Sequence, residues 1–260
     1  MIIAAIISIV IFTVALARVL FRKQNRPPVK PINQAYKNIL SEYVPFYREL
    51  NPLDKTVFEN RMMIFLSSVQ ITGIHTTVED MDTVFIAASA IIPIFGFPDW
   101  EYPNLKEVLL YPDSFDHESF NMKSDNRNTL GVVGTYALHN VMILSKLGLR
   151  DSFINKTGKT NVPVHEFAHL IDKTDGEIDG IPESIMSRQY VIPWLELMQK
   201  TMQEIRDGHS DIDPYGITNQ AEFFAVVSEY FFERPDLLED KHPELYELLS
   251  TIFKQNPKVG

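Results

Sequence analysis

The sequence HEFAH at residues 165–169 constrains the fold of this chain more than any other feature. It has the pattern His-Glu-x-x-His, whose chemistry depends on a helix. Residues four positions apart lie one above the other on one face of an α-helix, so the imidazoles of His165 and His169 can reach one metal ion at about 2.0 to 2.1 Å. Glu166 points in another direction, but it can approach a water molecule on that ion as a general base. The motif therefore predicts a helix that carries a metal site.

The residues around the motif favour this helix. Pro163 suits a first helical turn and Thr160 or Asn161 offers a capping side chain, so we expect a helix from residue 163 to residue 173. The alternative is an ordinary amphipathic helix whose histidines bond to neighbouring side chains. Two histidines and a glutamate seldom lie together on a mostly apolar helix without a metal ion to satisfy them, so the metal hypothesis is the stronger one.

Such an ion needs a third protein ligand, and the chain has no cysteine to supply it. Asp172 lies on the same helix face as His169, whereas Glu222 opens a second expected helix at 221–233. Three ligands from one short helix crowd one side of the ion, so we expect Glu222 to be the ligand; its alternative role is a helix cap with Asn219. Asp172 is then expected to bond to a histidine ring or to form a salt bridge at the helix end.

Glu229 lies on the second expected helix among large apolar residues. A carboxylate buried there needs a partner, and a ligand histidine is a natural one. Glu229 is therefore either the partner of a ligand histidine or a charge exposed to solvent.

The rest of the chain is typical of a helix-rich α+β domain. Helices are expected at 35–43, 52–69 and 81–92, short strands at 106–111, 131–136 and 140–145, and helices again at 163–173 and 221–233. Helices before and after a small group of strands favour an α+β fold over alternating β-α-β units. The run at 140–145 is expected to be the edge strand to which an extended peptide adds.

The N-terminal segment differs from the rest in hydropathy and charge. Residues 2–17 form an uncharged apolar run, and basic but no acidic residues follow it within residues 18–30. A helix of about 20 residues spans about 30 Å, the thickness of the hydrocarbon of a bilayer. Because the positive charges follow the run, we expect a single-pass protein of the cytoplasmic membrane with its catalytic domain in the cytoplasm. A cleaved signal peptide ending at residue 17 is the alternative, although its usual basic start is missing.

The overall charge excludes one class of partner. The chain has 34 acidic and 24 basic residues, a formal net charge of −10. Binding to nucleic acid depends on neutralising phosphates with basic side chains, so we expect no nucleic-acid partner.

The chain resembles the Mlc titration factor A family of zinc-dependent peptidases, a branch of the zincin metallopeptidases. The resemblance is carried by HEFAHLID at 165–172, DPYG at 213–216, NQAEFFAVVSEYFF at 219–232 and HPELYELLSTIFKQNP at 242–257, with looser similarity in KEVLLYP at 106–112 and in the 52–69 helix. It implies Zn²⁺ held by His165, His169 and Glu222, with Glu166 as the base. It also implies that Tyr215 is an active-site phenol.

The phenol of Tyr215 can donate to a developing oxyanion. His209 is a weaker candidate for that role, and the plain alternative for Tyr215 is a loop aromatic that packs on the core. The resemblance further implies aminopeptidase-like activity, and it implies a transcriptional repressor as a regulatory protein partner.

Together these observations predict three segments: a transmembrane anchor at 1–23, a basic proline-rich linker at 24–34, and a zincin-like metallopeptidase domain at 35–260 with a small mixed sheet. The expected function is a membrane-anchored zinc peptidase that hydrolyses peptide or protein substrates. One alternative is a membrane-tethered regulatory protein that binds a transcriptional repressor or another partner. Another is a zinc amidohydrolase or lipid-modifying enzyme that acts near the membrane.

Overall fold

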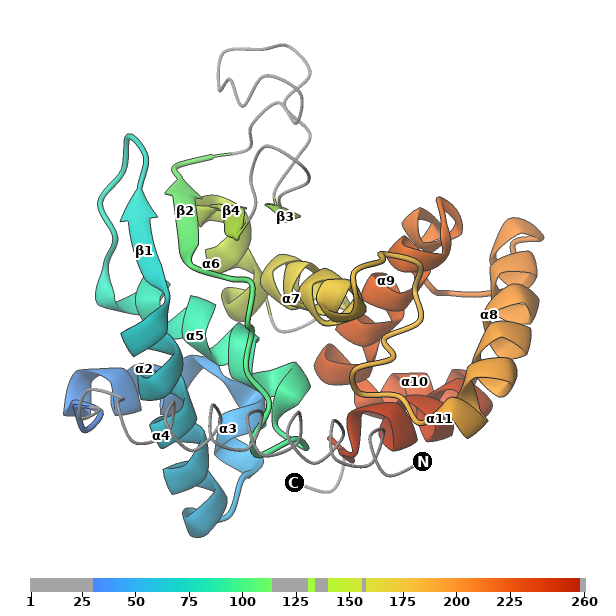
Figure 1. The fold of residues 1–260 in the computed structure, drawn as a ribbon, viewed down its shortest axis with the longest axis horizontal. Coiled ribbons are helices and arrows are strands. Elements are labelled where there is room, and N and C mark those ends of the chain that lie inside the picture. The colour runs from blue at the N-terminus through green and yellow to red at the C-terminus, as the bar shows by residue number, and fades with distance from the viewer. Residues whose placement is uncertain (1–29, 114–130, 134–139, 156–157, 258–260) are drawn as a thin grey trace, which may run out of the picture. The chain divides into compact units, whose positions relative to one another are not determined.

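The computed structural model describes residues 30–113, 131–133, 140–155 and 158–257 (Figure 1). The chain divides into two compact units, residues 1–31 and residues 32–260, and every helix and strand described below belongs to the second unit. In chain order these elements are α2 (Gln34–Tyr43), α3 (Pro45–Glu49), α4 (Pro52–Ser68), β1 (Gln70–Gly73), α5 (Asp80–Ile94), β2 (Glu107–Tyr111), β3 (Gly131–Val133), β4 (Val141–Ser145), α6 (Lys146–Ile154), α7 (Val162–Asp172), α8 (Val191–Arg206), α9 (Gln220–Glu233), α10 (Pro235–Lys241) and α11 (Pro243–Phe253). Short 3₁₀ turns lie at Lys173–Asp175, Arg188–Tyr190 and Pro214–Ile217, the last of them labelled η3. Helices thus dominate a mixed α+β unit with one small sheet.

The sheet has the strand order β1-β2-β4-β3. β1 pairs with β2 and β2 with β4 in parallel, with Leu109 opposite Ile143, whereas β3 pairs with β4 antiparallel. β4 therefore has a neighbour on each side, and the expectation that residues 140–145 form an edge strand is wrong. The physical reason is visible in its burial: Met142 to Ser145 are all buried, which is typical of a strand inside a sheet.

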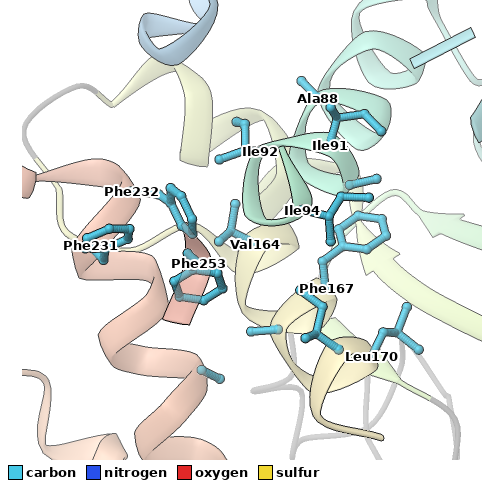
Figure 2. Close-up of a cluster of buried hydrophobic side chains, with 14 of the residues drawn as sticks. Ala88, Ile91, Ile92, Ile94, Val164, Phe167, Leu170, Phe231, Phe232 and Phe253 are labelled. Carbon is cyan, nitrogen blue, oxygen red and sulfur yellow. The ribbon is translucent and has the colours of Figure 1, made fainter. Parts of the chain in front are cut away.

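α7 lies at the centre of the helical core and packs against α5, α6 and α9. Val164, Phe167, Ala168 and Ile171 recur at the spacing of one helix face, and all four are fully buried. Figure 2 shows the ring of Phe167 beside Ile94 of α5, and Val164 between α5 and the ring of Phe232, with Phe253 close by. Burying each large side chain is worth about 1.5 to 3 kcal/mol, so this face fixes α7 firmly.

α9 is buried on nearly all sides, from Ala221 to Phe232 with the exception of the partly exposed Glu222. Its aromatic residues stack in the core; the ring centroids of Phe224 and Phe253 are 5.9 Å apart. Asn219 caps the start of this helix: its side chain accepts a hydrogen bond from the backbone N–H of Glu222 at 2.9 Å. This cap places Glu222 in the first turn, at the border between the core and solvent.

The expected localisation, a single-pass protein of the cytoplasmic membrane, has to be corrected. Within the part of the chain that the structure describes, no helix is both long enough and apolar enough to cross a membrane. The longest described helix, α4, has 17 residues and includes several charged ones, whereas a spanning helix needs about 20 mainly apolar residues. The expected anchor at 1–23 lies outside the described residues, as does the linker up to residue 29.

Candidate metal centre

The two histidines of the motif and Glu222 converge where α7 meets the start of α9. The Nε2 atoms of His165 and His169 are 3.1 Å apart. Glu222 Oε2 lies 3.0 Å from Nε2 of His165 and 3.4 Å from Nε2 of His169. Three atoms that can donate lone pairs to a cation thus form a compact triangle.

The dimensions of this triangle fit a divalent metal ion. Ligand atoms held at about 2.0 to 2.1 Å in a tetrahedron lie about 3.3 Å from one another. The candidate ligand atoms of His165, His169 and Glu222 all lie within 4.8 Å of one another, and the Nε2 and Oε2 atoms are closer still. Nitrogen and carboxylate oxygen are ligands that zinc accepts, and three of them leave a fourth position open. The residues present therefore form a candidate metal-binding site.

Glu229 lies two helical turns from Glu222 and fixes the ring of His165. His165 Nδ1 donates a hydrogen bond to Glu229 Oε1 at 2.7 Å, and the backbone N–H of Asn161 donates to Glu229 Oε2 at 2.6 Å. The bond to Glu229 turns the ring so that Nε2 faces Glu222 and His169, where it can donate a proton to Glu222 or, in the neutral ring, offer its lone pair to an ion. Glu229 is buried, so its two bonds also satisfy a charge that would be costly without partners.

The electrostatics of the triangle are those of a cation site. Burial disfavours the charged form of His165, but hydrogen bonds with Glu222 and Glu229 outweigh it and raise the pKa of His165 to about 10. Burial also raises the pKa of Glu222, but its hydrogen bonds with His165 and His169 lower it to about 2. The carboxylates thus hold a positive charge at Nε2 of His165, which a divalent ion can supply in place of the proton.

Glu166 is buried beside this group, with 6% of its surface exposed. Burial raises the pKa of its carboxyl, and the nearby His165 and His169 oppose that rise. A carboxyl whose pKa lies above its ordinary value takes up and releases a proton more readily near neutral pH.

Tyr215 lies in η3, just before α9, and is 54% exposed. Its ring centroid is 6.1 Å from that of His165. Partial burial and then the charges of Glu222 and Glu166 raise the pKa of its phenol, so the hydroxyl keeps its proton and remains a donor. His209 is exposed beyond the end of α8, and among the described residues it contacts none of the three candidate ligands.

Asp172 does not hold a histidine ring in the part of the chain that the structure describes. Its Oδ2 accepts a hydrogen bond from the backbone N–H of Gly180 at 2.9 Å, and no partner for Oδ1 is found among the described residues. Burial raises the pKa of Asp172 to about 6. The residue expected to bond to a histidine or to form a salt bridge thus ties down the loop that follows α7.

Sequence reasoning missed two residues around the centre and left a third open. Asn161, rather than Thr160, caps α7 by accepting from the backbone N–H of Val164, and its Nδ2 donates to Glu233 Oε1 at 2.6 Å. Glu233 was not expected here; its signal was its place one turn after Glu229 on α9. Gly180 was also missed, because its role depends on contacts with distant segments that local sequence patterns do not indicate.

The chain is similar to several known proteins over most of its length. The model of one protein family, described as glucose-regulated metallo-peptidase M90, matches residues 19–254. An uncharacterized protein of Synechocystis sp. is 28% identical over 241 residues, which cover 89% of this chain and 87% of that protein. The Mlc titration factor A proteins of Pectobacterium atrosepticum and of Klebsiella pneumoniae strain 342 are each 27% identical, over 66% and 81% of this chain and 68% and 79% of their own lengths.

Proposed function

Because this chain belongs to the glucose-regulated metallo-peptidase M90 family, we propose that it is a zinc-dependent peptidase whose active site is the group at the junction of α7 and α9. The family membership confirms the resemblance seen in the sequence. The observation that carries the proposal is the triangle of His165, His169 and Glu222, with the carboxyl of Glu166 buried beside it. A metal site that serves only structure has no need of a base at that position.

In this proposal each side chain has a separate task. His165, His169 and Glu222 would hold a zinc ion, which when bound would lower the pKa of a water molecule towards 7 and polarise the carbonyl of the scissile bond. Glu166 accepts the proton of the attacking water and then delivers it to the leaving amine. Tyr215 donates its phenolic proton in a hydrogen bond to the carbonyl oxygen as negative charge develops there. Glu229 keeps the ring of His165 turned so that Nε2 faces the ion.

The test compares wild type with Glu166→Gln. Glutamine has nearly the same shape as glutamate but cannot accept the proton, so we expect about 10²- to 10⁴-fold slower hydrolysis of a peptide library. Zinc content should stay that of wild type, because Glu166 is not a ligand in this assignment. Peptides with free and with acetylated N-termini separate aminopeptidase from endopeptidase activity.

Glu196→Gln is a matched control, because Glu196 is exposed on α8. It should hydrolyse peptides as wild type does. Equal hydrolysis by wild type and Glu166→Gln would show that Glu166 is not the base. A wild-type protein that binds zinc and cleaves none of the peptides would contradict the peptidase assignment altogether.

A second candidate function is the binding of a regulatory protein. Two of the relatives carry the name Mlc titration factor A, which points to an interaction with the regulator Mlc. For this chain such a function predicts a stable complex with a Mlc-type regulator that Glu166→Gln leaves intact. Complex formation without peptide hydrolysis by wild type would favour this second function over the first.

A further inference from the structure

Gly180 contacts three helices, α7, α8 and α9, and two of them carry the candidate metal ligands. Its backbone N–H donates to Asp172, the last residue of α7, at 2.9 Å. Its carbonyl accepts a hydrogen bond from Nε1 of the buried Trp194 on α8 at 2.7 Å. The segment that connects α7 to α8 therefore folds back past the start of α9, as Figure 1 also shows.

The third contact of Gly180 is with the backbone of α9 itself. A Cβ atom added to Gly180 would lie 2.3 Å from the carbonyl oxygen of Gln220 and 3.1 Å from the backbone nitrogen of Ala221. Real Cβ atoms essentially never come as close as 2.3 Å to another heavy atom, and the contacting atoms belong to the backbone, which cannot rotate away as a side chain can. Gln220 and Ala221 directly precede Glu222, so this contact is made at the turn that carries the third candidate ligand.

Trp194 attaches the same place to the aromatic core. Its ring centroid lies 5.9 Å from that of Phe223 and 6.0 Å from that of Phe224, both on α9. Trp194 thus packs on α9 while it holds the carbonyl of Gly180. One buried residue without a side chain thus contacts the last residue of α7, Trp194 on α8 and the first turn of α9.

We propose that Gly180, held by Asp172, is a positioning residue for the metal centre: it sets the distance at which Glu222 meets His165 and His169. This inference rests on the proposed metal site. The two distances that depend on Gly180 in this proposal are 3.0 Å and 3.4 Å, from Glu222 Oε2 to Nε2 of His165 and to Nε2 of His169. A side chain at position 180 would push the start of α9 away, and Glu222 would leave the triangle while the two imidazoles stayed on α7.

The first test measures zinc affinity for Gly180→Ala and Gly208→Ala by competition with a chelating dye. The two glycines have similar positive φ angles, +78° and +72°, so alanine is strained to a similar degree at both. An added Cβ meets nothing within 4 Å at Gly208, so only the contact with α9 differs. We expect about 10- to 100-fold weaker zinc binding for Gly180→Ala and unchanged binding for Gly208→Ala. Equal affinities of the two variants would overturn the proposal.

The second test keeps the proposal falsifiable if Gly180→Ala does not fold, which circular dichroism reports. Asp172→Asn retains an oxygen that accepts from the N–H of Gly180, whereas Asp172→Ala does not. We expect Asp172→Ala to lose zinc affinity and Asp172→Asn to keep it. An equal loss in both variants would mean that Asp172 acts through its charge, and wild-type affinity in both would mean that the bond is irrelevant; either result overturns the proposal.

These measurements use zinc alone, without substrate. A wild-type chain that binds zinc but hydrolyses no peptide would therefore contradict the proposed function and leave the role of Gly180 standing. A fully active Gly180→Ala variant with wild-type zinc affinity would do the reverse.

Discussion

At the scale of single residues, the centre depends on carboxylates that do different work because their surroundings differ. Glu222 is at the edge of solvent beside two imidazoles, which hold its pKa at about 2. Glu229 lies deeper on the same helix. One of its oxygens accepts a hydrogen bond from the His165 ring and the other accepts from the backbone N–H of Asn161. Glu233 follows, bonded to the side chain of Asn161. One face of α9 thus supplies a candidate ligand, a residue that orients a ligand, and an anchor for the end of α7.

Glu233 provides a prediction about pH. Burial raises the pKa of its carboxyl from 4.5 to about 7, and the hydrogen bond from Asn161 opposes this only in part. Between pH 4.5 and 7 the folded chain keeps a proton on Glu233 that the unfolded chain has released. The stability contributed by the protonated carboxyl is therefore complete below pH 4.5 and is lost as the pH rises through 7. Glu233→Gln keeps the acceptor for Asn161 but does not titrate.

We expect the difference in free energy of unfolding between Glu233→Gln and wild type, measured in urea, to shift by about 1 to 2 kcal/mol in favour of the variant from pH 5 to pH 8. Solvent screens this partly exposed group, which keeps the expected shift small. The exposed Glu196→Gln should show no such trend. A difference between Glu233→Gln and wild type that does not change with pH would contradict the protonated state of Glu233.

At the scale of elements, α7 and α9 are joined by two kinds of contact. Apolar side chains such as Val164 and Phe167 bury one side of α7 in the core. Asn161 donates two hydrogen bonds to α9, from its backbone N–H to Glu229 and from its side chain to Glu233, and its side chain also caps α7 by accepting from the backbone N–H of Val164. The cap of the motif helix is therefore part of the support of His165.

Replacing this cap tests that connection. Asn161→Ala should lower the free energy of unfolding by about 0.5 to 2 kcal/mol, the usual cost of a lost cap, and should weaken zinc binding about tenfold, because the side-chain bond from Asn161 to Glu233 is lost and only the backbone bond to Glu229 still joins this turn to α9. Asn51→Ala is the control, since Asn51 caps α4 by accepting from Leu53 and Asp54. It should lose similar stability in urea and bind zinc as wild type does. Similar zinc affinities of both variants would contradict the role of Asn161.

Local patterns predicted those elements whose signals are local. The helices expected at 35–43, 52–69, 81–92, 163–173 and 221–233 correspond to α2, α4, α5, α7 and α9, since apolar residues at helical spacing and capping residues are readable along the chain. β1 was missed because its four residues, QITG, directly follow α4 and are too few to show alternation. The helices α8 and α11 carry clear apolar faces but were not predicted as elements.

What the sequence did not reveal depends on contacts between distant segments. The order of strands is such a property, and β4 proved to be internal because β3 pairs with it. Glu222 could be predicted as a metal ligand because His165 and His169 have the spacing of a metal-binding pair, and such a pair needs a further ligand from a second helix. The partner of Asp172 is the backbone N–H of Gly180, and because every residue except proline has such a group, the residue type does not indicate this bond.

At the scale of the whole molecule, the candidate ion would connect the two helices around which the core is built. α7 packs on α5 and α6, and α9 packs on α8, α10 and α11. A ligand that binds only the folded chain stabilises it by mass action, by about 2.7 kcal/mol at a concentration 100 times the dissociation constant.

Zinc should therefore raise the melting temperature by about 5 to 10 °C at such a concentration, given about 2 to 4 °C per kcal/mol for domains of this size. A chelator should reverse the shift in a calorimetric or fluorescence melt. Glu222→Ala should show little or no shift, because two imidazoles alone hold the ion weakly. An undiminished shift in Glu222→Ala would place the stabilising ion somewhere else.

In the proposed site, two imidazoles from α7 and one carboxylate from α9 hold a single ion. Anomalous diffraction from crystals of wild-type protein grown with zinc, collected on both sides of the zinc absorption edge, tests it most directly. We expect one strong peak at about 2.0 to 2.2 Å from Nε2 of His165, Nε2 of His169 and a carboxylate oxygen of Glu222. A peak bound elsewhere on the chain, or one at the two histidines with Glu222 turned away, would contradict it.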